Sequence, residues 1–403
     1  MPMTLLPETI RAAKRTEGIT YAVRDIVTLA HEVAKTGREM LYLNIGDPNP
    51  FDFETPPHLI EAVLKAMREN RNGYSPSSGI PCAVKAVREE SERNGIRNIQ
   101  DIFITSGGSE AIEVCLAALV DRGDNVLIPY PGYPLYEAVL AKLEARPQPY
   151  LLDEADGWQP DIADMRRRID EKTRAIVLIN PNNPTGAVYT EKTLRSVLDL
   201  ARERNLLIFA DEIYDQLILD AGKKHISIAS LDPEAPVITF NGLSKGYIAP
   251  GWRIGWGVVS GNVELLRPYV AGINKLLRAR LCANHPMQYA VAAALNGPKD
   301  FQKAALDKLR RRRDITHRML NGAGISCVRP EAAFYAFPKL DIDMPDAEFV
   351  QGLIKATGVV AVHGSGFGQK PGTKHLRVVY LPQEPVLEKA YGKLLAYLAQ
   401  NAR

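Results

Sequence analysis

The chain has 403 residues, of which 46% are hydrophobic and 24% charged, and its formal net charge is +3. A chain of this length has room for two or three structural units with a buried core, and its composition is that of a folded globular protein. A net charge so close to zero gives no sign of a nucleic-acid partner, so we expect none.

Cysteine and histidine spacing and the N-terminus exclude further classes. The four cysteines, Cys82, Cys115, Cys282 and Cys327, lack CxxC spacing, and the seven histidines lack metal-ligand spacing. The start MPMTLLPETIRAAKRTEG lacks the apolar stretch of a signal peptide, and no apolar run approaches the ~18 residues of a membrane span. We therefore expect a cytoplasmic protein with free thiols, no metal and no membrane contact.

Short apolar runs alternate with amphipathic stretches in the middle of the chain. Strands are predicted at 102–105, 125–128, 174–179, 206–210, 237–240 and 254–259. The stretches SEAIEVCLAALV, LYEAVLAKL and TEKTLRSVLDLARERN between them predict helices. This alternation predicts an α/β fold with a mostly parallel sheet.

The pattern of charged and apolar residues changes after about residue 286. Long charged helical patterns such as DFQKAALDKLRRRRDITHRML are followed by short apolar runs, which predicts a smaller α+β unit. We expect an N-terminal arm that shares in the small domain at 1–55, a large domain at 56–290 and the C-terminal small domain at 291–403. The RRRR run at 310–313 is interpreted as a solvated helix face, and HGSGFG at 363–368 as a flexible loop near the site.

Five polar motifs follow predicted strands, which is where ligands bind in parallel sheets. In ITSGGSEAI, Gly107 and Gly108 allow close approach of the backbone, and a helix begins near Ser109. Free N–H groups at a helix N-terminus suit a phosphate, although the motif alone is better explained as a capped turn. In PYPGYPLYE, Tyr133 is suited equally to stacking on a flat ligand and to packing in the core.

Two further motifs carry amide and carboxylate groups. NPNNPTG, at 180–186, predicts a rigid turn whose Asn183 amide could donate to a ring hydroxyl oxygen. In FADEIY, Asp211 directly follows an apolar run. A carboxylate buried there needs a partner such as a protonated pyridine nitrogen, unless it only caps a helix. Tyr214 lies three residues further on, so we expect it to face the same site.

The fifth motif is NGLSKGYIAPGWRIGW, at 241–256. Lys245 can form a Schiff base with an aldehyde, Arg253 can bind a phosphate through two hydrogen bonds, and Ser244 can add a hydroxyl contact. Each of these could instead be an ordinary surface or structural residue. Five such motifs in this order, each at the end of a strand, are a rarer coincidence, and together they predict a site for a phosphorylated aldehyde cofactor.

The chain resembles the fold-type I, class I and II aminotransferases that use pyridoxal 5′-phosphate. The resemblance extends from YLNIGDPNP to HLRVVYLP and includes all five motifs. It implies the PLP-dependent transferase fold of type I, with a mostly parallel central sheet flanked by helices in the large domain and a smaller α+β domain. It also implies a homodimer whose other partners are small molecules, namely amino acids and 2-oxo acids.

The resemblance implies a role for each motif residue. The catalytic residues are Lys245, which binds the cofactor aldehyde, Asp211, which pairs with the ring nitrogen, and Tyr214, which binds the phenolic oxygen together with Asn183. Tyr133 stacks on the ring. The cofactor phosphate is held by Gly107, Gly108, Ser109, Ser244 and Arg253, and by Tyr74 of the partner subunit. The substrate carboxylate is bound by Arg377 and Gly46, with Tyr21 nearby.

The implied reaction is a ping-pong transfer of an amino group between an L-amino acid and a 2-oxo acid. RLC followed by a proline and a glutamine, together with NGLSK and NIGDPNPF, resembles the alanine branch. This favours L-alanine and 2-oxoglutarate, which give pyruvate and L-glutamate. Aspartate, branched-chain and diaminopimelate-type substrates remain open, as does a C–S lyase. An effector-sensing regulatory protein is a remote alternative, because the N-terminal residues show no helix-turn-helix pattern.

Three positions qualify the resemblance. Many relatives carry a hydroxyl residue three positions before the lysine, where this chain has Gly242, so one phosphate contact is expected to be absent. Arg278 and Arg280 could bind a distal substrate carboxylate across a subunit interface, or could be surface cations, which is the better interpretation of Arg278.

Overall fold

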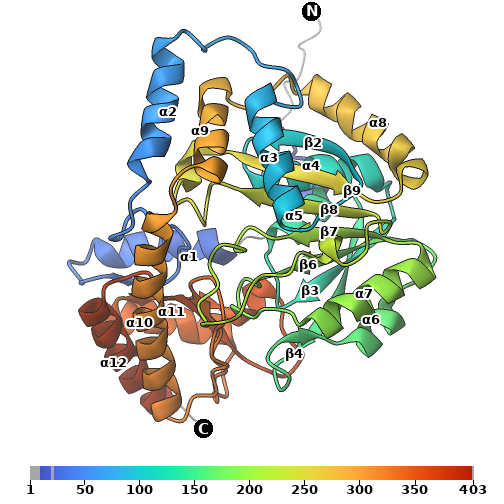
Figure 1. Ribbon diagram of the computed structural model, residues 1–403. Helices are drawn as coiled ribbons and strands as arrows, with labels where there is room; N and C mark the ends of the chain where they lie inside the picture. Colours follow the sequence, from blue (N-terminus) through green and yellow to red (C-terminus); the bar gives the residue numbers. More distant parts are fainter. Residues whose placement is uncertain (1–9, 20–21, 402–403) are drawn as a thin grey trace, which may run out of the picture.

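The centre of the computed structural model, which describes residues 10–19 and 22–401, is an eight-stranded sheet (Figure 1). The strand order is β2-β9-β8-β7-β6-β3-β4-β5. The strands are β2 (Ile99–Thr105), β3 (Asn125–Tyr130), β4 (Arg146–Asp153), β5 (Gln159–Pro160), β6 (Thr173–Ile179), β7 (Leu207–Asp211), β8 (Val237–Gly242) and β9 (Gly255–Ser260). Strands β4, β3, β6, β7 and β8 are parallel, and β9 is antiparallel to both its neighbours.

The predicted α/β fold with a mostly parallel sheet is therefore confirmed. All six predicted strands are present, but β4 and β5 were not predicted. The sequence of β4, RPQPYLLD, contains Pro147 and Pro149, and prolines in a run argue against a strand. Here β4 lies next to the short β5, which ends the sheet.

Helices cover both faces of the sheet (Figure 1). On one face lie α4 (Gly108–Leu119), α5 (Leu135–Lys142) and α8 (Val263–Ala279), and on the other lie α6 (Ile162–Arg168) and α7 (Glu191–Arg204). Alternate residues of β6 enter the two cores, with Val177 on the α4 side and Ile176 on the α7 side. A third group, α2 (Pro57–Arg68), α3 (Pro81–Arg93) and α9 (His285–Asn296), packs against the β2–β9 end.

The N-terminal segment and the C-terminal third share one further core, away from the sheet (Figure 1). Its helices are α1 (Ala22–Ala34), α10 (Asp300–Gly322), α11 (Asp346–Thr357) and α12 (Glu384–Asn401), and its strands are β1 (Leu41–Tyr42), β10 (Tyr335–Ala336), β11 (Val359–Val360), β12 (Val362–His363) and β13 (Leu376–Val379). Strand β1 pairs with β11 in parallel. Because α9 crosses residue 290 and packs on α2 and α3, we propose that the large domain ends after α9.

The interpretation of the RRRR run as a solvated face is wrong for two of its residues. Arg312 and Arg313 are only 1% and 2% exposed. Arg312 donates to both carboxylate oxygens of Asp52 at 2.7 and 2.8 Å, and Arg313 donates to Asp220 at 2.6 Å. Each partner comes from a distant part of the chain, so the local charge pattern gave no sign of it.

The HGSGFG segment also differs from its prediction. Residues Gly364–Phe367 form a short 3₁₀ helix, where a loop was predicted, and the Phe367 side chain is buried. Its ring centroid lies 4.4 Å from the guanidinium carbon of Arg377, which places it near the predicted site. Within residues 10–19 and 22–401, no helix is long and apolar enough to cross a membrane.

Candidate active site

A cavity of about 910 Å³ lies where the parallel strands end. Strands β3, β6, β7 and β8 share their carboxyl edge, and the antiparallel β9 begins there, so the motifs that follow or precede them converge. The predicted residues that line the cavity are Gly46, Gly108, Ser109, Tyr133, Asn183, Asp211, Tyr214, Ser244, Lys245, Arg253 and Arg377.

Lys245 lies in the turn after β8 and points its amine into this cavity. Its Nζ donates a hydrogen bond of 2.6 Å to the carbonyl oxygen of Gly46. Burial lowers the pKa of Lys245 to about 8, because a low-dielectric setting disfavours the charged amine. Asp47 opposes this shift, whereas the cations Arg377 and Arg253 reinforce it. The amine is therefore partly neutral, and hence nucleophilic, near neutral pH.

Asp211 is the last residue of β7 and is 5% exposed. Burial raises the pKa of its carboxyl group to about 6, while hydrogen bonds from the Ile213 amide at 3.4 Å and the Tyr136 hydroxyl at 3.3 Å partly offset the shift. A carboxylate in this setting is costly unless a cation or hydrogen-bond donor meets it. Asp211 is thus suited to hold a protonated ring nitrogen.

The N-terminus of α4 is suited to bind an anion. Gly107 has a φ of 85°, and a Cβ there would lie 2.4 Å from Nη2 of Arg253, so the guanidinium lies directly against its backbone. The same Nη2 donates to Oγ of Ser109 at 2.8 Å. Free N–H groups of the first helical turn, the helix dipole and a fixed cation together attract a phosphate.

The geometry accounts for the glycine that departs from the family pattern. A Cβ at Gly242 would lie 2.7 Å from the carbonyl oxygen of Ile254 and 3.0 Å from Cα of Gly255. The close approach of β9 therefore leaves no room for a side chain, because real Cβ atoms do not approach other heavy atoms so closely.

Arg377 reaches the other end of the cavity from β13 and is 3% exposed. Its Nη1 donates to Oδ1 of Asn183 at 3.1 Å, and its Nη2 donates to the carbonyl oxygen of Asn44 at 2.6 Å. Its guanidinium carbon lies 4.7 Å from the ring centroid of Tyr335. A cation held so firmly is suited to bind a carboxylate.

The geometry agrees with the comparisons to known proteins. A family model described as aminotransferase class I and II matches residues 38–394. The chain belongs to this family. It is therefore an aminotransferase, as the motifs predicted.

Individual relatives match this aminotransferase over nearly its whole length. It is 41% identical to an alanine aminotransferase of Mycobacterium tuberculosis (strain ATCC 25618 / H37Rv), over 95% of this chain and 91% of that protein. It is 37% identical to the glutamate-pyruvate aminotransferase AlaA of Escherichia coli (strain K12), over 97% and 98%. The solved structure of an alanine aminotransferase from Pyrococcus furiosus matches with a TM-score of 0.93 at 41% identity, over 97% and 100%.

Tyr74 and Arg280, which were predicted to act across a subunit interface, do not line this chain's own cavity. Tyr74 is 83% exposed. Tyr21 lies outside the described residues. Arg280 donates to the carbonyl oxygens of Ser77 at 3.1 Å and Ile104 at 2.7 Å, so it is engaged with backbone away from the cavity. Arg278 is exposed, as its preferred interpretation predicted.

Two tyrosines whose hydroxyl groups meet predicted site residues were missed by the sequence analysis. Tyr136 lies three residues after Tyr133 at the start of α5, and this helical spacing was the available signal. Tyr335 lines the cavity from β10, and its hydroxyl lies 2.9 Å from that of Tyr214. Nothing in the local pattern AAFYAFPKL distinguishes Tyr335 from a core residue.

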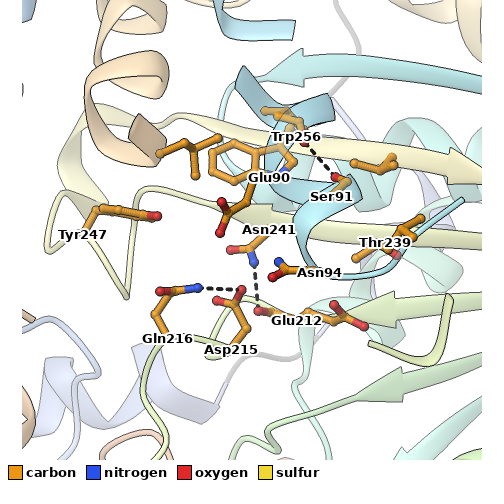
Figure 2. A pocket seen from close by; sticks show the side chains of 14 residues that line it. Glu90, Ser91, Asn94, Glu212, Asp215, Gln216, Thr239, Asn241, Tyr247 and Trp256 are labelled. Carbon is orange, nitrogen blue, oxygen red and sulfur yellow. Dashed lines mark hydrogen bonds between the residues drawn. The ribbon is translucent and has the colours of Figure 1, made fainter. Parts of the chain in front are cut away.

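A second, smaller cavity lies on the other side of the turn after β7 (Figure 2). Asp211 faces the large cavity, whereas its neighbours Glu212 and Asp215 line the small one. Gln216 donates to Asp215, and Asn241 donates to the carbonyl oxygen of Glu212, each at 3.1 Å (Figure 2). Its volume of about 30 Å³ suits a water molecule and is far too small for a cofactor.

Proposed function

We propose that this aminotransferase exchanges the amino group between L-alanine and 2-oxoglutarate, forming pyruvate and L-glutamate, with pyridoxal 5′-phosphate as its cofactor. The relatives named alanine aminotransferase and glutamate-pyruvate aminotransferase support the substrates. The observation that carries the proposal is the joint placement of Lys245 and Asp211 in one cavity with an anion site.

The residues present fit the cofactor. The anion site at Gly107, Gly108, Ser109, Ser244 and Arg253 would hold the phosphate. Asp211 would hold the ring nitrogen in its protonated form, and Tyr133 would lie against the ring. The oxygen of Asn183 accepts from Arg377, which leaves its Nδ2 to donate to the phenolic oxygen, together with Tyr214. When bound, the cofactor acts as an electron sink that stabilises negative charge on the substrate Cα.

The protein supplies binding and proton transfer. Arg377 binds the α-carboxylate of the amino acid, with the Gly46 backbone beside it, and so directs the Cα proton toward the middle of the cavity. Lys245 would hold the cofactor covalently through its amine. Its Nζ, when free, would act on the substrate Cα proton as the general base and then as the acid. Asp211 stays ionised throughout.

The apolar lining of the cavity supports a small substrate side chain. Ile45, Phe51 and Tyr42 contribute to it. Among the described lining residues, the cations are Lys245, Arg253 and Arg377, so the distal carboxylate of 2-oxoglutarate finds no further cation within this set. The apolar lining suits the methyl group of alanine, and the preference for alanine over aspartate rests on the relatives named above.

We propose further that the enzyme works as a homodimer in the cytoplasm. Tyr74 is a highly exposed aromatic residue on a well-anchored loop, since His285 binds the Gly73 carbonyl at 2.8 Å and Gln288 donates to Ser75 at 3.0 Å. The exposure of Tyr74 is explained if its ring packs, in the dimer, against the phosphate-binding end of the cavity in a second copy of the chain. The four cysteines are free, which suits a reducing compartment. A sedimentation mass equal to one chain would refute the dimer.

The test is a half-reaction assay of the purified holoenzyme. L-Alanine alone should abolish the absorbance of the lysine-bound cofactor and release one equivalent of pyruvate per active site. Continuous turnover should require 2-oxoglutarate as well. If aspartate reacts and alanine does not, the proposed substrate is wrong. If cysteine or cystathionine yields pyruvate continuously without any 2-oxo acid, the enzyme is a C–S lyase instead.

A further inference from the structure

Tyr335 touches three separate parts of the site described above. It lies on β10, is 2% exposed and lines the cavity. Its hydroxyl meets that of Tyr214 at 2.9 Å, and its ring lies 4.7 Å from the guanidinium carbon of Arg377. Tyr214 belongs to the segment after β7, whereas Arg377 lies on β13, so this one side chain joins the large and small units at the site.

The third contact is with the backbone at Gly46. A Cβ added at Gly46 would lie 2.0 Å from the hydroxyl oxygen of Tyr335, so the hydroxyl occupies the space that any other residue would fill. The carbonyl oxygen of Gly46 is the acceptor for Lys245 Nζ at 2.6 Å. Tyr335 therefore also packs against the backbone group that orients the reactive amine.

The packing fixes the position of Tyr335 firmly. Strand β10 pairs with β13, with Tyr335 opposite Val379 and Ala336 opposite Val378, so Tyr335 and Arg377 share one small sheet. The ring of Tyr214 meets Tyr335 and Phe334 edge-on, with centroids 5.7 Å apart in both cases. Removing either hydroxyl of this buried pair would break the hydrogen bond between Tyr335 and Tyr214, and this loss would destabilise the folded protein.

We propose that Tyr335 is a positioning residue with two separable effects, a proposal that rests on the function proposed above. Through its hydroxyl it donates to Tyr214, which leaves the Tyr214 proton to be donated to the phenolic oxygen of the cofactor. Its ring packs against the guanidinium of Arg377 and so holds this carboxylate-binding group in place.

Two substitutions separate these effects. Tyr335→Phe removes the hydroxyl and keeps the ring, whereas Tyr335→Leu removes both. Tyr391→Phe is the matched control, because Tyr391 is fully buried and its hydroxyl also meets another hydroxyl, that of Thr316 at 3.0 Å, away from the cavity. The readouts are the pH titration of the visible absorbance of the bound cofactor, the binding of the unreactive carboxylate propionate, and kcat and KM for alanine.

The proposal predicts that Tyr335→Phe raises the pKa seen in the absorbance titration, because a hydrogen bond to the charged phenolic oxygen has been weakened. We expect kcat to fall about 3- to 10-fold, the effect of one hydrogen bond, with propionate binding within two-fold of the wild type. Tyr335→Leu should in addition weaken propionate binding about 3- to 30-fold. In a Tyr214→Phe background, Tyr335→Phe should add no further shift of the titration.

Several outcomes would overturn the proposal. One is an active Tyr335→Phe enzyme whose absorbance titration matches those of the wild type and Tyr391→Phe. Another is a titration shift that persists in the Tyr214→Phe background. If Tyr335→Leu does not fold, the Phe variant and the cycle with Tyr214 still decide the hydroxyl effect. A wild-type protein without the absorbing cofactor, or without a response to alanine, would instead refute the proposed function.

Discussion

Lys245 shows how a single residue acquires reactivity from its surroundings. An ordinary lysine amine is almost fully protonated at neutral pH, and a protonated amine cannot attack an aldehyde. Burial brings the pKa of Lys245 down to about 8 in the cofactor-free chain. The reactive form is thus already present at the pH of a cell, before any cofactor binds.

This pKa predicts how cofactor-free protein recaptures pyridoxal 5′-phosphate. Because only the neutral amine reacts, the rate of covalent capture should rise with pH through about 8 and level off above about 9. Stopped-flow absorbance between pH 6.5 and 10 measures it, with Lys245→Ala as the control that shows no covalent signal. A rate that continues to rise through pH 10 would mean that the amine keeps its ordinary pKa.

Residue type and position were enough to predict most side chains of the candidate site. Lys245, Asp211 and Asn183 lie at or within four residues of the ends of strands, where ionised and amide side chains are unusual. Tyr335 and Tyr136 could not be predicted in this way, because tyrosines in apolar segments are common core residues. Their relevance depends on which distant hydroxyl or carboxylate they meet, and only the folded chain shows this.

Among the elements, α10 departs most from its sequence-based description. Its arginines look alike in the sequence, yet Arg312 has 2% of its side chain exposed and Arg311 has 61%. Arg312 meets Asp52, which belongs to the segment that follows β1. Partial burial acts to raise the pKa of Asp52, but hydrogen bonds from Arg312 and Lys308 hold it below its usual value. The Arg312–Asp52 ion pair therefore joins the segment after β1 to α10.

Breaking this pair should destabilise the small unit. Arg312→Met leaves Asp52 without its main partner, and we expect the free energy of unfolding to fall by about 3 kcal/mol, as for other buried pairs that lose one member. Arg311→Gln, the neighbouring exposed control, should change it by less than about 0.5 kcal/mol. Urea unfolding followed by circular dichroism measures both variants, and equal values would contradict the assigned role.

The pair also predicts a dependence on pH. Because the pKa of Asp52 is lowered in the folded chain, its contribution to stability is present above the unfolded pKa, about 4, and is lost as the pH falls through the lower folded value. The difference between the wild type and Arg312→Met should therefore shrink below about pH 4. A difference that stays constant down to pH 2 would show that the ion pair is not its source.

At the scale of the whole molecule, local periodicity predicted the sheet and its parallel character. It could not predict β4, whose prolines imitate a loop. The N-terminal segment was expected to share in the small domain, but the individual contacts of that shared core, which joins Ile26 to Leu394, leave no local signature in either segment. The site lies between the two units, which is why Arg377 and Lys245, 132 positions apart in the sequence, face one cavity.

The central claim is that one amine, that of Lys245, carries the cofactor opposite the Asp211 carboxylate. Borohydride reduction of the purified holoenzyme, followed by digestion and mass spectrometry of the peptides, tests this most directly. The account predicts a single pyridoxyl label on the peptide that contains Lys245, and no label in Lys245→Ala. A label on any other lysine, or a purified protein that takes up no pyridoxal 5′-phosphate, would contradict it.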